Sequence, residues 1–121
     1  MKMKKTVRPC PESPNCVSSQ STDPSKWMAP LRFKGQAPTV RAEILTLLER
    51  MPRVRVVEAE DDYIHAEFTT LLFRFVDDVE LVIDSDEKLV HFRSASRVGS
   101  SDLGTNRRRM AKLCRRLEPG L

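Results

Sequence analysis

The side chains most able to do chemistry gather in HFRSASRVGSSDLGTNRRR, residues 91–109, around the end of a predicted strand and just before a basic helix. Arg97 precedes the helix N-terminus, where free backbone N–H groups and the helix dipole favour an anion. Ser94 and Ser96 lie just upstream and add hydroxyl donors. Asp102 has the alternative role of a helix cap, and no GxxxxGK[ST] phosphate loop is present. We therefore expect one of two partners for Arg97: a phosphate or carboxylate bound at this bend, or an internal partner, since Asp78 is close enough for Arg97 to fix the strand end and serve the fold alone.

A second group of charges lies on the two strands that lead into this stretch. If the turn SDEK, residues 85–88, forms the tip of a hairpin, Glu80 falls directly opposite Arg93. Asp78 and His91 then share the face of this pair, because side chains alternate along a strand. The alternative is a solvated cross-strand ion pair, which contributes on the order of 0.2–1 kcal/mol.

The same alternation bears on catalysis. His91 is the base nearest in sequence to Ser94, but parity places the two on opposite faces of the sheet. It also directs Asp77 away from Asp78 and Glu80, which argues against paired carboxylates in acid–base work. We therefore expect no catalytic residues and favour a non-catalytic domain that binds an anionic small molecule or a protein partner. A hydrolase-like enzyme using the Asp, Glu, Ser and Arg side chains is the alternative.

Periodicity predicts the elements that position these residues. Apolar residues at helical spacing follow Pro38 and stop at Pro52, which predicts the first helix. Alternating apolar residues then predict four strands, and a last helix follows Gly99. The order α-β-β-β-β-α predicts an α+β domain with an antiparallel four-stranded meander and both helices on one face. The residues assigned to the strands are Val54, Val56, Ile64, Ala66, Phe68, Phe73, Phe75, Val79, Leu81, Ile83, Val90 and Phe92.

The chain before the first helix has a different character. Prolines at 9, 11, 14, 24 and 30 remove backbone donors and restrict the preceding residues, so we expect residues 1–36 to form an irregular arm. Residues 37–121 then form the single α+β domain. Large apolar side chains are expected to anchor the arm on the core. They are Trp27, Met28, Leu31 and Phe33.

Charge is distributed unevenly along the chain. The net charge is +4, but residues 1–8 and 107–121 together hold ten Lys/Arg against one acid, so the ends are basic and the body is acidic. The basic residues of the last helix are expected on its outer side, where weak, non-specific nucleic-acid binding is a further alternative. No aromatic residues lie between them to stack on bases. They are Arg108, Arg109, Lys112, Arg115 and Arg116.

Three cysteines leave the redox chemistry open. Cys10 and Cys16 are six residues apart in a proline-bent segment, whereas Cys114 lies on the predicted inner face of the last helix. A disulfide between the first two and a pair of reduced thiols are both compatible with this spacing. Two cysteines and two distant histidines make a poor zinc site, so we expect no metal and no cofactor. No apolar run is long enough for a membrane span or a leader, and we expect a cytoplasmic protein.

Three segments carry a resemblance to a known family. CPESPNCVSS at 10–19, FVDDVELVID at 75–84 and the stretch 91–109 resemble the hallmark segments of the uncharacterised family called domain of unknown function 1499. The resemblance extends from Cys10 to the last helix and implies no particular activity. It places emphasis on Cys10, Cys16, Asp77, Asp78, Glu80, Arg93, Ser94, Ser96, Arg97, Gly99, Asp102, Asn106 and Arg107. The residues predicted to bind a ligand are Asp78, Glu80, Arg93, Ser94, Ser96, Arg97, Asp102, Asn106 and Arg107.

Overall fold

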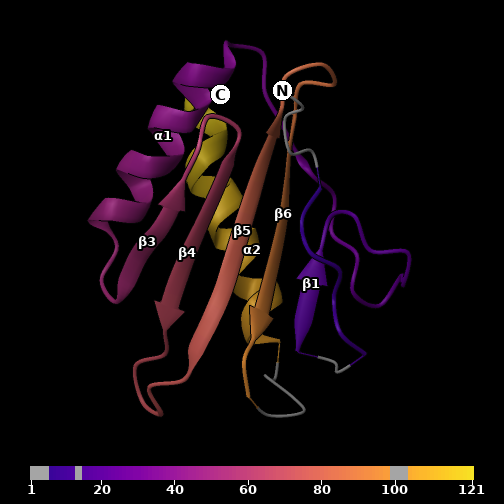
Figure 1. The fold of residues 1–121 in the computed structure, drawn as a ribbon, viewed down its shortest axis with the longest axis vertical. Coiled ribbons are helices and arrows are strands. Elements are labelled where there is room, and N and C mark those ends of the chain that lie inside the picture. The colour runs from indigo at the N-terminus through magenta and orange to yellow at the C-terminus, as the bar shows by residue number, and fades with distance from the viewer. Residues whose placement is uncertain (1–5, 13–14, 99–103) are drawn as a thin grey trace.

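A computed structural model describes residues 6–12, 15–98 and 104–121 of the chain. Two helices and a six-stranded antiparallel sheet make up an α+β fold, drawn in Figure 1. The elements are β1 (Cys16–Ser18), β2 (Leu31–Arg32), α1 (Ala37–Arg50), β3 (Val54–Ala59), β4 (Tyr63–Thr69), β5 (Val76–Asp84), β6 (Leu89–Ser96), α2 (Thr105–Leu117) and the short 3-10 helix η1 (Glu118–Gly120).

The sheet is larger than the sequence predicted. The meander β3-β4-β5-β6 is present, but β1 and β2 extend it by pairing with the outer edge of β6, so the strand order is β1-β6-β5-β4-β3. A four-stranded sheet was wrong because the prolines hide two short segments that can still pair. Cys16 lies opposite Ala95 and Leu31 opposite Val90. These segments satisfy backbone groups that an exposed edge would leave unpaired.

The register of the last hairpin is confirmed. Glu80 pairs with Arg93, and Leu81 pairs with Phe92, as the alternation requires. Asp84 begins the turn, and its Oδ1 accepts the backbone N–H groups of Asp86 and Glu87 at 3.1 and 3.2 Å. This local bonding fixes the turn, and the turn fixes which side chains of β5 and β6 share a face.

Both helices cover the same face of the sheet, as predicted (Figure 1). The core lies between the helices and the inner face, and it includes apolar side chains from the arm as well. Its main members are Val17, Leu31, Phe33, Val40, Ile44, Leu48, Val79, Leu81, Ile83, Val90, Phe92, Met110, Leu113 and Leu117. In the part of the chain that the structure describes, the opposite, outer face of the sheet carries no helix. This face positions most of the charged residues of the strands.

Three apolar residues are not where the sequence placed them. Phe73 and Phe75 were assigned to the third strand, but β5 begins at Val76, and both phenylalanines are exposed in the β4–β5 loop. The prediction was wrong because their period-two spacing continues that of β5. Arg74 between them adopts a left-handed backbone (φ 59°), which a strand does not allow. Trp27, predicted as an anchor, is 46% exposed, and its indole N–H donates to the Ser19 carbonyl.

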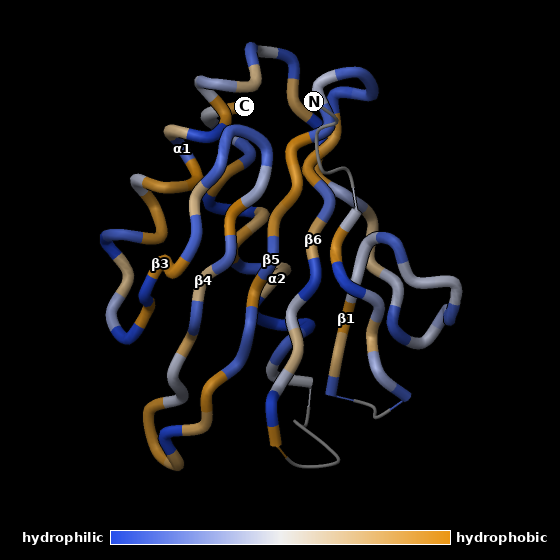
Figure 2. The backbone as a smooth tube through the Cα atoms, viewed as in Figure 1, coloured by the Kyte–Doolittle hydropathy of each residue, from blue (hydrophilic) through white to orange (hydrophobic). Residues whose placement is uncertain are grey.

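Figure 2 shows the hydropathy of each residue along the backbone, both in the strands and in the exposed β4–β5 loop. The sheet strands alternate between hydrophilic and hydrophobic positions, as expected for strands with one face on a core. The β4–β5 loop, by contrast, contains a hydrophobic segment that projects at the lower end of the view in Figure 2, and its apolar residues are exposed.

Candidate functional site

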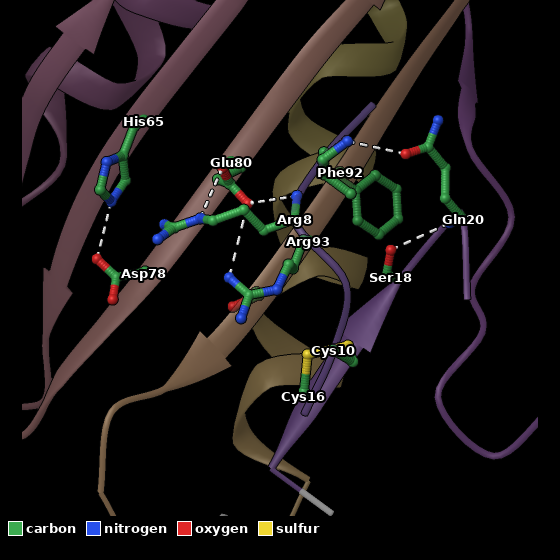
Figure 3. A network of polar contacts seen from close by, with 12 residues as sticks. Arg8, Cys10, Cys16, Ser18, Gln20, His65, Asp78, Glu80, Phe92 and Arg93 are labelled. Carbon is green, nitrogen blue, oxygen red and sulfur yellow. Dashed lines mark hydrogen bonds and ion pairs between the residues drawn. A yellow bond between two sulfur atoms is a disulfide. The ribbon is translucent and has the colours of Figure 1, made fainter. Parts of the chain in front are cut away.

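Most of the charged residues of β4, β5 and β6 lie on the outer face of the sheet, and Asp77 of β5 is an exception. Strand alternation directs them away from the helices, and the arm contributes one further arginine, Arg8 (Figure 3). We call this set the outer-face cluster. It consists of Arg8, Tyr63, His65, Glu67, Asp78, Glu80, Arg93 and Arg97.

Glu80 lies at the centre of the cluster and its side chain is completely buried. Its Oε1 accepts the Arg8 backbone N–H at 3.1 Å, and its Oε2 accepts Arg8 Nε–H at 3.1 Å. The Tyr63 hydroxyl also donates to Oε2. Burial alone would raise the pKa of Glu80, but these donors and the charges of Arg8 and Arg93 outweigh it and lower the pKa. Burial and the adjacent carboxylate raise the pKa of Tyr63, which keeps its hydroxyl a donor.

Arg93 is poorly satisfied by the carboxylate opposite it. Its Nη1 lies 3.6 Å from Glu80 Oε1, which is an ion-pair distance but too long for a good hydrogen bond. Its Nε is buried and has no hydrogen-bond partner in the structure. Its side chain is only 11% exposed, and burial together with the like charge of Arg8 lowers the pKa of Arg93 despite the opposing effect of Glu80. Two guanidinium groups therefore share one carboxylate here.

Arg97 has the partners that Arg93 lacks. Its Nε donates to Asp78 Oδ2 at 2.8 Å, while Nη2 donates to Asp78 Oδ1 at 2.9 Å and to Glu67 Oε2 at 2.7 Å. His65 Nε2 lies 2.8 Å from Asp78 Oδ1. The hydrogen bonds from Arg97, aided by His65, lower the pKa of Asp78 to about 2 against the opposing effect of burial. The charges in this half of the cluster are therefore paired, and Glu67 also pairs with Arg55 of β3 at 3.2 Å.

The arm is fastened over the cluster by several contacts. Cys10 and Cys16 form a disulfide with a Cα–Cα distance of 5.8 Å, which joins the first part of the arm, residues 6–12, to β1 (Figure 3). The backbone N–H of Val7 donates to Gln20 Oε1 at 2.9 Å, and the Val7 side chain packs in a buried cluster with Tyr63 and Val82 on the outer face. These contacts hold Arg8, which lies between them, against Glu80.

Three residues of the predicted ligand site lie on the inner face instead. Asn106 on α2 is fully buried, and its Nδ2 donates to Ser96 Oγ at 2.9 Å. Ser94 Oγ donates to Asn106 Oδ1 at 2.5 Å. Arg109 donates to Asn106 Oδ1 and to Asp77 Oδ2, both at 2.7 Å. This inner polar cluster joins α2 to β5 and β6, so the structure divides the predicted site between the two faces of the sheet.

The remaining predicted residues fall elsewhere. Arg107 donates to the backbone carbonyls of Ser25 and Trp27 at 3.0 and 3.3 Å, which ties α2 to the arm. Asp102 lies outside the described residues. Arg109 was expected on the outer side of the last helix, and this was wrong, because its side chain turns inward to Asp77 and is only 11% exposed.

The described residues offer no ready nucleophile or metal site within the outer-face cluster. The register confirms that Ser94 and His91 lie on opposite faces. His91 Nδ1 instead lies 3.0 Å from the buried Ser19 Oγ, which already accepts the Phe92 N–H at 2.8 Å. In the described part of the chain, no group of three His, Cys, Asp or Glu side chains is arranged to hold a metal ion.

Arg8, Tyr63 and His65 were missed by the sequence interpretation. Tyr63 and His65 share the parity of Glu67 and alternate with the core residues of β4, a signal that could have placed them beside β5. Arg8 lies 72 residues from Glu80 in sequence, and no local pattern indicates that contact.

Together these features define a small α+β fold with both helices on one face of the sheet. The other face carries the outer-face cluster, which is covered in part by an arm that a disulfide joins to β1. The chain belongs to the family described as protein of unknown function (DUF1499), whose family model matches residues 6–117. The resemblance of the three sequence segments is thereby confirmed. No curated protein matches the chain. Among the described residues, no helix has the length and apolar character needed to cross a bilayer.

Proposed function

We propose that this protein is a non-catalytic binding domain that takes an anionic small molecule at Arg93 on the outer face of the sheet. The observation that carries the proposal is the buried Nε of Arg93, which has no hydrogen-bond partner among the described residues. A buried N–H donor without a partner costs about 1–3 kcal/mol, more when charged, so a carboxylate or phosphate oxygen bound there recovers that loss.

The local charge supports the same proposal. Arg8 and Arg93 bring two positive charges to one buried carboxylate, Glu80. A bound anion balances the excess positive charge, and it opposes the effects of burial and of the like charge of Arg8, which lower the pKa of Arg93. Arginine suits this role because its planar fork binds carboxylates and phosphates through two donors.

The surroundings offer room for the rest of a ligand. The side chain of Arg8 is 55% exposed, so its guanidinium, which shares the Glu80 carboxylate with Arg93, is accessible from solvent. A groove of about 600 Å³ lies within the arm, between residues 6–12 and residues 18–26, and Arg8 and Cys10 line it. Arg93 does not line this groove. The anionic group of the ligand would therefore bind at Arg93, and the groove would accept the rest of a larger ligand.

The two alternatives receive less support from the contacts. A hydrolase-like enzyme needs a free nucleophile beside a base, whereas Ser94 faces the helices and Ser19 is buried against Phe92. Nucleic-acid binding by the last helix loses Arg109, which is bonded to Asp77.

Thermal unfolding in the presence of inorganic phosphate or acetate tests the proposal. Wild type is expected to gain stability as the anion concentration rises, because a ligand that binds only the folded state stabilises it. Arg93→Gln is expected to abolish the gain, whereas Arg115→Gln, which removes an exposed arginine of α2, should retain it. An equal gain in wild type and Arg93→Gln would refute the site.

A further inference from the structure

The β4–β5 loop exposes an apolar surface that the anion site does not use. Leu71, Leu72, Phe73 and Phe75 are 69%, 81%, 69% and 46% exposed. The loop lies at the end of the sheet opposite the C-terminus (Figure 1), and Figure 2 shows its hydrophobic segment projecting there. Such a continuous exposed apolar segment marks an interaction site rather than scattered surface apolar residues.

The loop has a defined shape. Thr70 closes it, since its backbone N–H donates to the Phe75 carbonyl at 2.8 Å and its Oγ1 accepts the Phe75 N–H at 2.9 Å. The rings of Phe73 and Phe75 stack at 5.6 Å between centroids. Because these bonds hold the apolar side chains outward, docking orders them at little cost in conformational entropy.

Among the described residues around the loop, the charged side chains without an ion pair are basic. Arg74 is at its tip, and a groove of about 370 Å³ beside Leu71 is lined by Arg53, Lys112 and Arg116, without any acidic residue. In the part of the chain that the structure describes, none of these four basic residues forms an ion pair. The nearest acids in sequence, Asp77 and Asp78, are neutralised by Arg109 and Arg97.

We propose that this loop docks the protein on an anionic phospholipid bilayer, with the leucines and phenylalanines inserted at the interface and the basic residues against the headgroups. Shallow insertion of apolar side chains combined with basic residues is the arrangement that peripheral membrane binding needs. At a bilayer, Arg74 extends from the apolar tip to the phosphates. An apolar protein surface would instead desolvate its charge without compensation.

Vesicle co-sedimentation tests this. Wild type should pellet with vesicles of equal parts phosphatidylcholine and phosphatidylglycerol, but much less with phosphatidylcholine alone. Leu72→Ser with Phe73→Ser should weaken partitioning at least about tenfold, because two apolar side chains that insert into the bilayer are lost. Val57→Ser, which removes a half-exposed valine of β3 away from the loop, is the apolar control and should leave partitioning unchanged.

The left-handed residues provide a matched charge test. Arg74 and Lys88 have nearly the same positive φ (59° and 60°), a conformation that asparagine tolerates, and Lys88 lies in the β5–β6 turn at the other end of the sheet. Arg74→Asn should weaken partitioning about fivefold, whereas Lys88→Asn should not.

Three results would overturn the inference. The first is a wild type that does not pellet with anionic vesicles, and the second is a loop double variant that pellets as well as wild type. The third is a dimer, seen by sedimentation velocity, that the loop variant abolishes, since the apolar surface would then join two copies of the chain. None of these results bears on anion binding at Arg93.

Discussion

Arg93 and Glu80 lie directly opposite each other on β6 and β5, yet their closest charged atoms are 3.6 Å apart and no hydrogen bond joins them. Glu80 directs its oxygens toward Arg8 and Tyr63 instead. Cross-strand pairing therefore places the two charges opposite each other, but the carboxylate of Glu80 accepts its hydrogen bonds from Arg8 and Tyr63 rather than from Arg93. The proposed anion site follows from this competition.

Arg97 has a structural role in this account. Arg97→Ala removes three hydrogen bonds to Asp78 and Glu67, and we expect a loss of about 1 kcal/mol in the free energy of unfolding, because Arg97 is nearly half exposed and solvent screens its ion pairs. The stabilisation by phosphate should remain. Urea unfolding with and without phosphate measures both quantities, and a variant of normal stability that no longer responds to phosphate would move the site from Arg93 to Arg97.

Asp78 should make the protein sensitive to acid. Its pKa of about 2 in the folded protein is below the ordinary value of 3.8, so its stabilising contribution is present above about pH 4 and is lost as the pH falls towards 2. Solvent screening at Arg97 reduces that contribution to about 1 kcal/mol. Unfolding free energies of wild type and Asp78→Asn should therefore converge with acidification. Glu49→Gln, on the exposed side of α1, is the control, and a constant gap between wild type and Asp78→Asn would contradict the assignment.

The hydroxyl of Tyr63 stabilises the charged form of Glu80. Tyr63→Phe removes the hydroxyl that donates to Glu80 Oε2, and we expect a loss of about 1–2 kcal/mol in the free energy of unfolding. Because that hydrogen bond lowers the pKa of Glu80, the variant should also begin to unfold at a higher pH than wild type when acidified. The same substitution in a Glu80→Gln background should cost less, and an equal cost in both backgrounds would show that the hydroxyl acts elsewhere.

The disulfide should couple stability to anion binding. Cys10→Ser with Cys16→Ser is expected to cost about 2 kcal/mol, the chain-entropy value for so short a loop. It should also weaken the response to phosphate, since Arg8 lies two residues from Cys10 and loses its tether. Cys114→Ser is the control, because burial and Glu118 raise the pKa of the Cys114 thiol to about 11 and it forms no disulfide. Retention of the full phosphate response without the disulfide would remove Arg8 from the site.

Local sequence patterns were sufficient for the register of the last hairpin. Period-two alternation in β5 and β6 and a four-residue turn determine the pairing, so Glu80 opposite Arg93 and Asp77 opposite Ser96 were both predictable. The same rule failed at Phe73 and Phe75, because alternation alone does not show where a strand ends. Only the backbone conformation of Arg74 distinguishes the loop from the strand.

Contacts of the arm were not predictable in the same way. β1 and β2 are three and two residues long, too short for a periodic signal, and they form by completing the edge of β6. The contact of Arg8 with Glu80 depends on that edge and on the disulfide. The pairing of Glu80 with Arg93 and the position of Asp78 on the same face were therefore predicted, and the contributions of the arm and of β4 were missed. Ser94, Ser96 and Asn106 were predicted for the same site but lie on the inner face.

The most direct test of the central claim is the NMR signal of the Arg93 Nε–H during a titration with inorganic phosphate. This signal should shift and saturate, because the buried Nε of Arg93 has no partner among the described residues and gains one on binding. The Arg97 Nε–H, which already donates to Asp78 at 2.8 Å, should change little. An Arg93 signal that does not respond to phosphate, or a saturating shift at Arg97 alone, would contradict anion binding at Arg93.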